Sequence, residues 1–449
     1  LDDTVEAVDL AQSPADIVFL SFTDSDLALM AAAWERAGEG APTLRLANLA
    51  LLRHPYSVDL HVEKGCARAR FVLVRLLGGM DYWRYGVEQL SDAARRHGFQ
   101  LAVVPGDHME DPRLDAASTM PVEELRRLWG WFQCGGLENA ASCLGWIGSV
   151  LGREMPWSEP EPLPSAGLFA EACRPAPERG SSDPQLNSAS EDARSGRALI
   201  VLYRAHVASA DTAPIIALAD ALAARDIAVD AVFVTSLKDP SAAMVLERHI
   251  ATHPPDVILN ATAFSGRLDE GGSVLDRADR PVLQVILAGS TREAWESGTR
   301  GLSAADLAMN VVLPEADGRI VTTAISFKEP APRSEVLQFS RLVHTPDAGR
   351  VAHVADLAAA WVRLGRMAPA QRRLALVMSD YPGTGGREGY AVGLDTPASI
   401  GCIASALRAA GYAVGDLPEG DGPRRALAGG GLRAPAGGAP PARLCPPPP

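Results

Sequence analysis

The chain has 449 residues, 47% of them apolar, and a mean hydropathy of +0.02. This length predicts about three domains, and no apolar run approaches the roughly 18 residues that span a bilayer. The net charge of −13 argues against nonspecific binding to nucleic acid or anionic membranes. The first residues are acidic, unlike a secretory signal, so a cytoplasmic location is expected. The six cysteines fall in no zinc-binding spacing.

Strands and helices alternate in the first region, residues 1–155, which predicts a doubly wound parallel sheet. Short apolar runs indicate four strands, at 16–22, 43–49, 71–76 and 101–105. Helical patterns lie between and after them, at 26–37, 56–68, 83–97, 122–133 and 137–152.

Residues 156–196 are rich in Pro, Glu, Ser and Gly without an apolar period, and we interpret them as a linker. The same alternation of strands and helices returns in residues 197–345 and predicts a second doubly wound sheet. Its strands are expected at 198–205, 228–234, 256–260 and 281–287, with helices at 212–225 and 241–253.

Residues 346–420 predict the opening of a third α/β unit: a helix at 351–366, then a buried strand at 374–378, a glycine-rich loop and a helix after Asp395 or Thr396. The loop matches neither a dinucleotide fingerprint nor a P-loop, and it is either a structural connection or a ligand-binding loop at a strand end. From 421 to 449 the chain is almost entirely Gly, Pro, Ala and Arg, which cannot form a core. This segment is either a disordered tail or a frameshifted, premature end, and we favour the second interpretation.

Candidate binding residues lie where the strands of the second sheet end, because ligands of open parallel sheets bind at that edge. Arg204, His206 and Asp211 follow the first strand, and an Arg there can hold a carboxylate through its two-pronged guanidinium. The alternative is that Arg204 pairs with a neighbouring acid and that His206 is an ordinary loop residue. Further candidates are Lys238, Asn260 and Ser290 after later strands of this sheet, and Asp380, Tyr381, Gly385 and Gly386 in the glycine-rich loop.

Two other patterns have structural explanations that compete with a functional one. His249 and His253 are spaced i, i+4 on a predicted helix, which puts both rings on one face as a metal site requires, but the helix dipole alone favours His near a C-terminus. The aromatic residues Tyr82, Trp83 and Tyr85 could present a flat surface to a planar ligand, or belong to the core. We assign neither catalytic residues nor metal ligands from the sequence.

Taken together, several segments resemble the large subunits of cobaltochelatase, a family shared with the large subunits of magnesium chelatase. The resemblance runs in order from residue 1 to about 420. It is carried by strings such as LRLANLALLRHPYSVDLHVEK (44–64), VRLLGGMDYWRYGVEQL (74–90), YRAHVASADTAPI (203–215) and SDYPGTGGREGYAVGLDTPAS (379–399).

The resemblance implies an enzyme subunit that inserts a divalent metal into a tetrapyrrole. In the cobalt branch, which the sequence resembles more, it implies Co²⁺ and hydrogenobyrinic acid a,c-diamide as substrates in cobalamin biosynthesis. Two partner subunits, one an AAA+ ATPase, would use ATP, which agrees with the lack of a P-loop in this sequence. The residues named above at the strand ends, Arg204 and Lys238 among them, would then contact the acidic tetrapyrrole.

Members of this family are several times longer, so we expect an N-terminal fragment that is inactive alone. Two alternatives remain open. One is a magnesium-chelatase large subunit acting on protoporphyrin IX, and the other is a noncatalytic α/β binding or assembly module.

Overall fold

The computed structural model describes residues 6–175, 196–268, 272–377 and 393–415. The chain divides into two compact units, residues 1–362 and 363–449. The first unit contains two sheets flanked by helices, so the predicted α/β fold class with parallel sheets is confirmed. Within the described residues, no helix is both long enough and apolar enough to cross a membrane.

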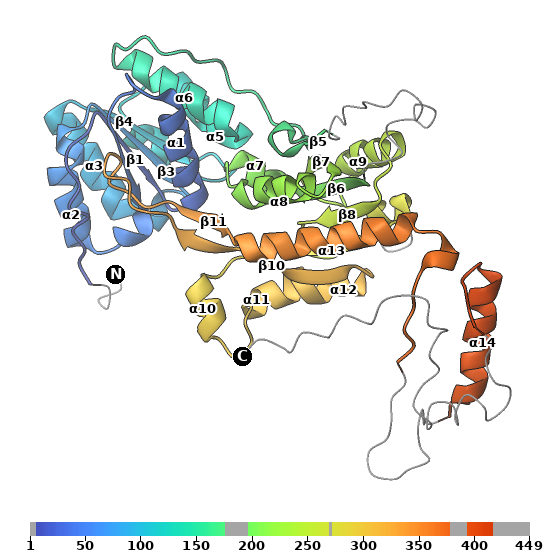
Figure 1. The fold of residues 1–449 in the computed structure, drawn as a ribbon. Coiled ribbons are helices and arrows are strands. Elements are labelled where there is room, and N and C mark those ends of the chain that lie inside the picture. Colours follow the sequence, from blue (N-terminus) through green and yellow to red (C-terminus); the bar gives the residue numbers. More distant parts are fainter. Residues whose placement is uncertain (1–5, 176–195, 269–271, 378–392, 416–449) are drawn as a thin grey trace. The chain divides into compact units, whose positions relative to one another are not determined.

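The first sheet is wholly parallel, with the strand order β2-β1-β3-β4. Alternate residues of each strand face opposite sides, and each side is covered by helices. One set packs with α1, α5 and α6, and the other packs with α2 and α3, as Figure 1 shows. The elements are β1 (Ile17–Ser21), α1 (Asp24–Ala37), β2 (Leu44–Asn48), α2 (Pro55–Lys64), β3 (Phe71–Leu76), α3 (Arg84–His97), β4 (Gln100–Pro105), α4 (Pro112–Ala117), α5 (Val122–Cys134) and α6 (Leu137–Val150).

The second sheet has seven strands in the order β11-β10-β9-β8-β6-β7-β5. Strands β6 to β10 are parallel, whereas β5 and β11 are antiparallel additions at the two edges. The strands are β5 (Ala166–Leu168), β6 (Gly196–Tyr203), β7 (Ile227–Val234), β8 (Val257–Asn260), β9 (Val282–Ala288), β10 (Ile320–Pro330) and β11 (Leu342–Pro346). The sequence analysis missed β5, β10 and β11.

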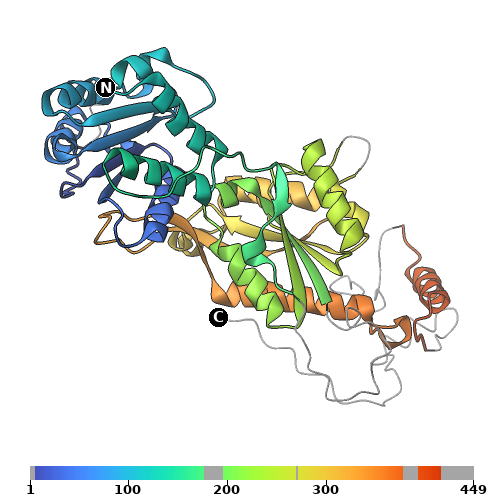
Figure 2. The ribbon, with the colours of Figure 1, turned by 90° about the horizontal axis from the view of Figure 1, so that it is seen from above.

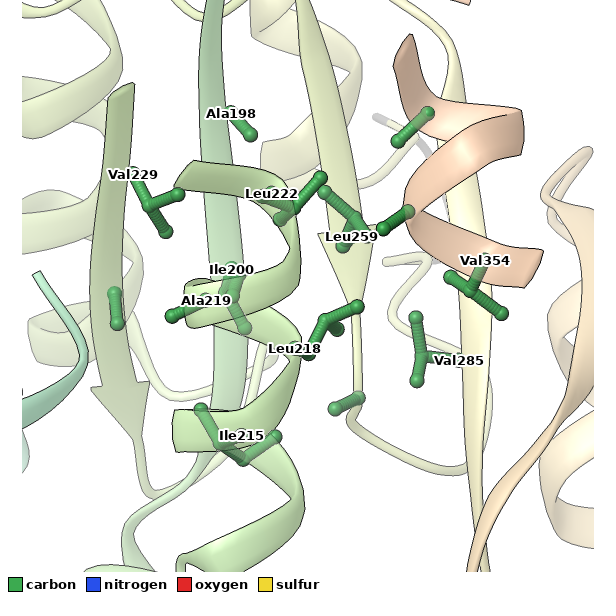
Figure 3. Close-up of a cluster of buried hydrophobic side chains, with 14 of the residues drawn as sticks. Ala198, Ile200, Ile215, Leu218, Ala219, Leu222, Val229, Leu259, Val285 and Val354 are labelled. Carbon is green, nitrogen blue, oxygen red and sulfur yellow. The ribbon is translucent and has the colours of Figure 1, made fainter. Parts of the chain in front are cut away.

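Helices cover both faces of the second sheet. On one face, α8 and α13 pack against β6 to β9, and their shared core includes Ile200, Leu218, Leu259 and Val354 (Figure 3). Figure 2 shows these two helices on the same side of the strands. The helix α9 packs on the opposite face. The helices of this region are α7 (Arg204–Ala208), α8 (Ala213–Ala223), α9 (Pro240–Thr252), α10 (Arg292–Ser297), α11 (Ala304–Asp306), a π-helix (Leu307–Val312), α12 (Leu313–Ala316) and α13 (Ala348–Arg366).

The parallel strands of both sheets follow the same winding. The chain runs from a central strand to a neighbour on one side, then crosses to the other side, so the direction reverses between β1 and β3 and between β6 and β8. Ligands of open α/β sheets bind at the carboxyl ends of the strands at such a reversal. The two positions therefore mark where a site is expected.

In the second unit, α14 (Thr396–Ala409) forms at the predicted place, and the Asp395 side chain caps it by accepting a hydrogen bond from the Ala398 amide at 3.0 Å. The strand predicted at 374–378 is wrong over its described part, because residues 374–377 are exposed and form no strand. No neighbouring strand in the described part of the chain offers this apolar run hydrogen-bond partners. The glycine-rich loop lies outside the described residues.

Candidate functional site

A cavity of about 450 Å³ lies within the first unit where residues near the ends of β1 and β6 meet β10 and the edge strand β11. This volume falls within the range of small-molecule pockets. The walls come from α1, the end of α5, the turn through α7, and one residue of β10 together with two of β11. Its polar and apolar lining includes Asp26, Leu29, His108, Phe132, Gln133, Arg204, His206, Ser209, Asp211, Lys328, Leu342 and His344.

The turn after β6 supplies most of the polar lining. β6 ends at Tyr203, the single turn of α7 follows, and Ala210 adopts a left-handed conformation with φ of 55° before α8 begins. The Gly136 amide donates a hydrogen bond of 2.9 Å to the Ala208 carbonyl, which ties α7 to the connection between α5 and α6. This backbone contact fixes α7 against the end of α5, and both segments line the cavity.

Three potential ligand side chains converge in this cavity, namely His206, Asp211 and His344. Their nitrogen and oxygen donor atoms all lie within 4.8 Å of one another. The Asp211 carboxylate accepts two hydrogen bonds from His344, one from its backbone N at 2.9 Å and one from Nδ1 at 2.6 Å. The His206 and His344 rings meet edge to face, with centroids 5.6 Å apart.

Burial lowers the pKa of His206 to about 4, and the neighbouring His344 lowers it further against the opposing effect of Asp211. Burial raises the pKa of Asp211, but the hydrogen bonds from His344 outweigh it and hold that pKa below its ordinary value. At neutral pH the cavity therefore contains an uncharged His206 imidazole beside an ionised carboxylate.

Two cationic side chains, Arg204 and Lys328, line the cavity and differ in the hydrogen bonds that they make. Arg204 donates to the backbone carbonyls of Cys134, Leu163 and Pro164 at 3.1 to 3.2 Å, so it fastens the segment before β5 rather than pairing with an acid. Lys328 of β10 makes no side-chain hydrogen bond within the described residues, although its charge acts on His206. Lys328 is thus the better placed of the two to meet an anionic ligand.

A buried ion pair lies at the reversal point of the first sheet. Arg75 of β3 pairs with Asp26 of α1, and their side chains are 11% and 9% exposed. The Ser21 hydroxyl donates to the other Asp26 oxygen at 2.8 Å, and Arg75 also donates to the Gly106 carbonyl at 3.0 Å. Asp26 also lines the cavity, so the pair holds one of the lining side chains in place.

The predicted site residues do not all come together. Arg204, His206 and Asp211 line the cavity, whereas Lys238 is exposed after β7 and does not. Asn260 is buried and bonded to Thr262 and Gln284, and Ser290 has a buried hydroxyl without a hydrogen-bond partner among the described residues. The other four candidates, Asp380, Tyr381, Gly385 and Gly386, lie outside the described residues.

The histidine pair on α9 and the aromatic residues at 82, 83 and 85 have structural contacts that explain them. His249 bonds to Asp230 at 3.2 Å and stacks on His253 with centroids 4.9 Å apart, and these residues do not form a cluster of metal-ligand atoms as the cavity does. Trp83 is buried and donates to the Leu52 carbonyl, while Tyr82 and Tyr85 are exposed. These three aromatic residues therefore do not form one flat surface.

Sequence reasoning missed Asp26, Lys328 and His344 as cavity residues. His344 and Lys328 lie opposite each other in the antiparallel β10–β11 pairing. Placing them in the cavity would have required predicting both strands and their pairing. A larger hollow of about 620 Å³ is lined only by residues within 149–156, which are neighbours in sequence. The cavity of about 450 Å³, which brings distant segments together, is therefore the candidate site.

Comparison with known proteins identifies the family. A model of the family described as CobN/Magnesium Chelatase matches residues 129–431. The chain is 43% identical over 442 residues to an aerobic cobaltochelatase subunit CobN from Sinorhizobium sp, covering 96% of this chain and 34% of that protein. It is 40% identical to the subunit of the same name from Pseudomonas aeruginosa, covering 91% of this chain and 32% of that one.

Among solved structures, the chain resembles the catalytic subunit of cobaltochelatase from Mycobacterium tuberculosis, with a TM-score of 0.71 and 27% identity. The match covers 93% of this chain and 33% of that one, so the chain spans about one third of the length of the relatives it matches. The chain belongs to the CobN/magnesium chelatase family.

Proposed function

We propose that the chain is part of the large subunit of a cobaltochelatase, which inserts Co²⁺ into hydrogenobyrinic acid a,c-diamide during cobalamin biosynthesis. Two partner subunits, one of them an AAA+ ATPase, would drive the reaction with ATP, and the enzyme would act in the cytoplasm, where ATP is supplied. The identities of 43% and 40% to aerobic cobaltochelatase subunits support the cobalt branch. This region would contribute to substrate binding, with catalysis requiring the rest of the assembled enzyme.

The observation that carries the proposal is the cavity where the turn after β6 meets α1 and the strands β10 and β11. It combines apolar walls, including Leu29, Phe132 and Leu342, with Lys328, whose ammonium group has no hydrogen-bond partner within the described residues. Apolar walls suit one edge of the macrocycle, and a free ammonium suits a carboxylate at its rim. Arg204, engaged with carbonyls, would shape the wall instead of binding the ligand.

The cavity's donor atoms also bear on the alternative of a magnesium chelatase acting on protoporphyrin IX. Imidazoles favour cobalt and its neighbours, whereas Mg²⁺ prefers a shell of oxygen ligands and water. Two of the three clustered side chains, His206 and His344, are imidazoles. The cobalt branch is therefore the better supported of the two. The noncatalytic binding or assembly module stays as the second alternative.

A titration of the purified chain with hydrogenobyrinic acid a,c-diamide, followed by absorbance and tryptophan fluorescence, tests the proposal, with protoporphyrin IX as competitor. We expect selective binding of the corrinoid. Lys328→Met should weaken it about tenfold, as loss of a charge-assisted contact implies, while the matched variant Lys238→Met should bind like the parent chain. Preference for protoporphyrin would favour the magnesium branch, and absence of binding to both would favour the noncatalytic module.

A further inference from the structure

The cluster of His206, Asp211 and His344 has the composition of a metal centre and is assembled from distant parts of the chain. His206 and Asp211 belong to the turn between β6 and α8, and His344 lies 133 residues after Asp211 on the edge strand β11. The donor atoms lie within 4.8 Å of one another. A single ion coordinated at about 2 Å by each donor needs donor atoms no more than about 4 Å apart, so small side-chain movements would bring these three around one ion.

The hydrogen bonds of the cluster position its members for ligation. Asp211 is held by the His344 backbone N and Nδ1, which fixes the orientation of the His344 ring and leaves its Nε2 for another partner. Carboxylate–imidazole pairs of this kind orient metal-binding His residues in proteins. The His206 ring makes no hydrogen bond within the described residues, so both of its nitrogens lack a partner there.

Charges around the cluster also matter for a cation. Asp211 carries the negative charge nearest to it, and the carboxylate of Asp26, also in the lining, is neutralised by Arg75. Lys328 and Arg204 line the same cavity, and the Arg204 guanidinium is bound to backbone carbonyls. Lys328 would weaken the attraction of a bare cation, but it would attract an anionic ligand to the same place.

We propose that His206, Asp211 and His344 form a binding site for one divalent transition-metal ion of the Co²⁺ or Zn²⁺ class. Two imidazoles and a carboxylate, the carboxylate acting directly or through His344, leave coordination positions open to water or to an incoming ligand. Mg²⁺ and Ca²⁺ are disfavoured by the two nitrogen ligands. The inference does not require chelatase activity, because a noncatalytic member of the family could bind the same ion.

Co²⁺ titration of the tag-free chain, read by its visible absorption and by equilibrium dialysis, tests the site. We expect a saturable spectrum from one bound ion that Zn²⁺ displaces and excess Mg²⁺ does not. His206→Ala and His344→Ala should each weaken binding at least about tenfold, and Asp211→Asn by about 10- to 100-fold.

The matched control is the double variant His249→Ala with His253→Ala, which removes the stacked pair on α9 and should leave the spectrum unchanged. His206→Gln keeps the proposal testable if another variant fails to fold. The His206 ring makes no hydrogen bond within the described residues, so this substitution should not remove a contact that stabilises the fold. Folding of each variant is checked by circular dichroism. The inference is overturned if the spectrum persists in His206→Gln or disappears in the α9 control. Loss of corrinoid binding with intact Co²⁺ binding would refute the proposed function alone.

Discussion

Replacing Asp26 by Asn should destabilise the first sheet strongly, because it leaves the Arg75 guanidinium buried without its counter-charge. The side chain of Arg75 is only 11% exposed, and its Nε already lacks a hydrogen-bond partner within the described residues. Breaking a buried pair by removing one partner costs about 3–5 kcal/mol. We expect the lower end, about 3 kcal/mol, because Arg75 keeps its bond to Gly106 and its contact with the Phe132 ring.

Hydrogen exchange measured by mass spectrometry provides the assay, since it reports local opening free energies strand by strand. Ser21 and Arg75 are register partners in the β1–β3 pairing, so peptides covering these strands report directly on the pair. A loss of about 3 kcal/mol corresponds to exchange faster by roughly a hundredfold. Peptides from β6 and β7 serve as an internal reference and should be unaffected.

Asp24→Asn is the matched control, because Asp24 opens the same helix and bonds to the Asn48 side chain from a partly exposed position. It should change exchange in β1 and β3 by less than about tenfold. The reasoning is refuted if Asp26→Asn also changes exchange by less than about tenfold, or if both variants act equally.

Two further predictions concern stability. His61 is buried with no partner for its Nε2 among the described residues, and burial lowers its pKa from 6.5 to about 4. Between these pH values the unfolded chain binds a proton that the folded chain does not, so the free energy of unfolding should fall by roughly 3 kcal/mol as the pH drops from 6.5 through 4. Urea unfolding should show a weaker pH dependence in His61→Leu, and equal pH dependence in the variant and the parent chain would contradict this prediction. Gly86→Ala should lower the free energy of unfolding by about 1–3 kcal/mol, because an added Cβ would lie 2.2 Å from the buried Trp83 ring. The helical control Gly365→Ala, whose added Cβ meets nothing within 4 Å, should lose no stability in thermal melts. Equal effects of the two substitutions would contradict the expected clash with Trp83.

Alternation of apolar runs with helical patterns was enough to predict every parallel strand of the two sheets except β10. The strand at 71–76 forms over the predicted residues, and Asp395 caps α14 as its side chain and position suggested. These features depend on local sequence, namely apolar runs, capping side chains and turn residues. The polar turn after β6 was found because strand-end position is also a local property.

The rest of the cavity depends on contacts between residues far apart in the chain. β10 carries exposed and polar positions among its apolar ones, and β11 is a five-residue antiparallel edge strand, so neither gives a clear apolar period. Because these strands carry Lys328 and His344, the sequence alone placed neither residue at the site. The segment 374–377 shows the reverse error, since an apolar run without a neighbouring strand among the described residues does not form one.

Cobalt-edge anomalous diffraction from crystals of the chain grown with Co²⁺ and hydrogenobyrinic acid a,c-diamide would show whether the cavity holds both the metal and the corrinoid. We expect a cobalt peak bounded by His206, Asp211 and His344, with the corrinoid density beside it and a carboxylate near Lys328. A cobalt peak at His249 and His253, or corrinoid density away from the cavity, would contradict it.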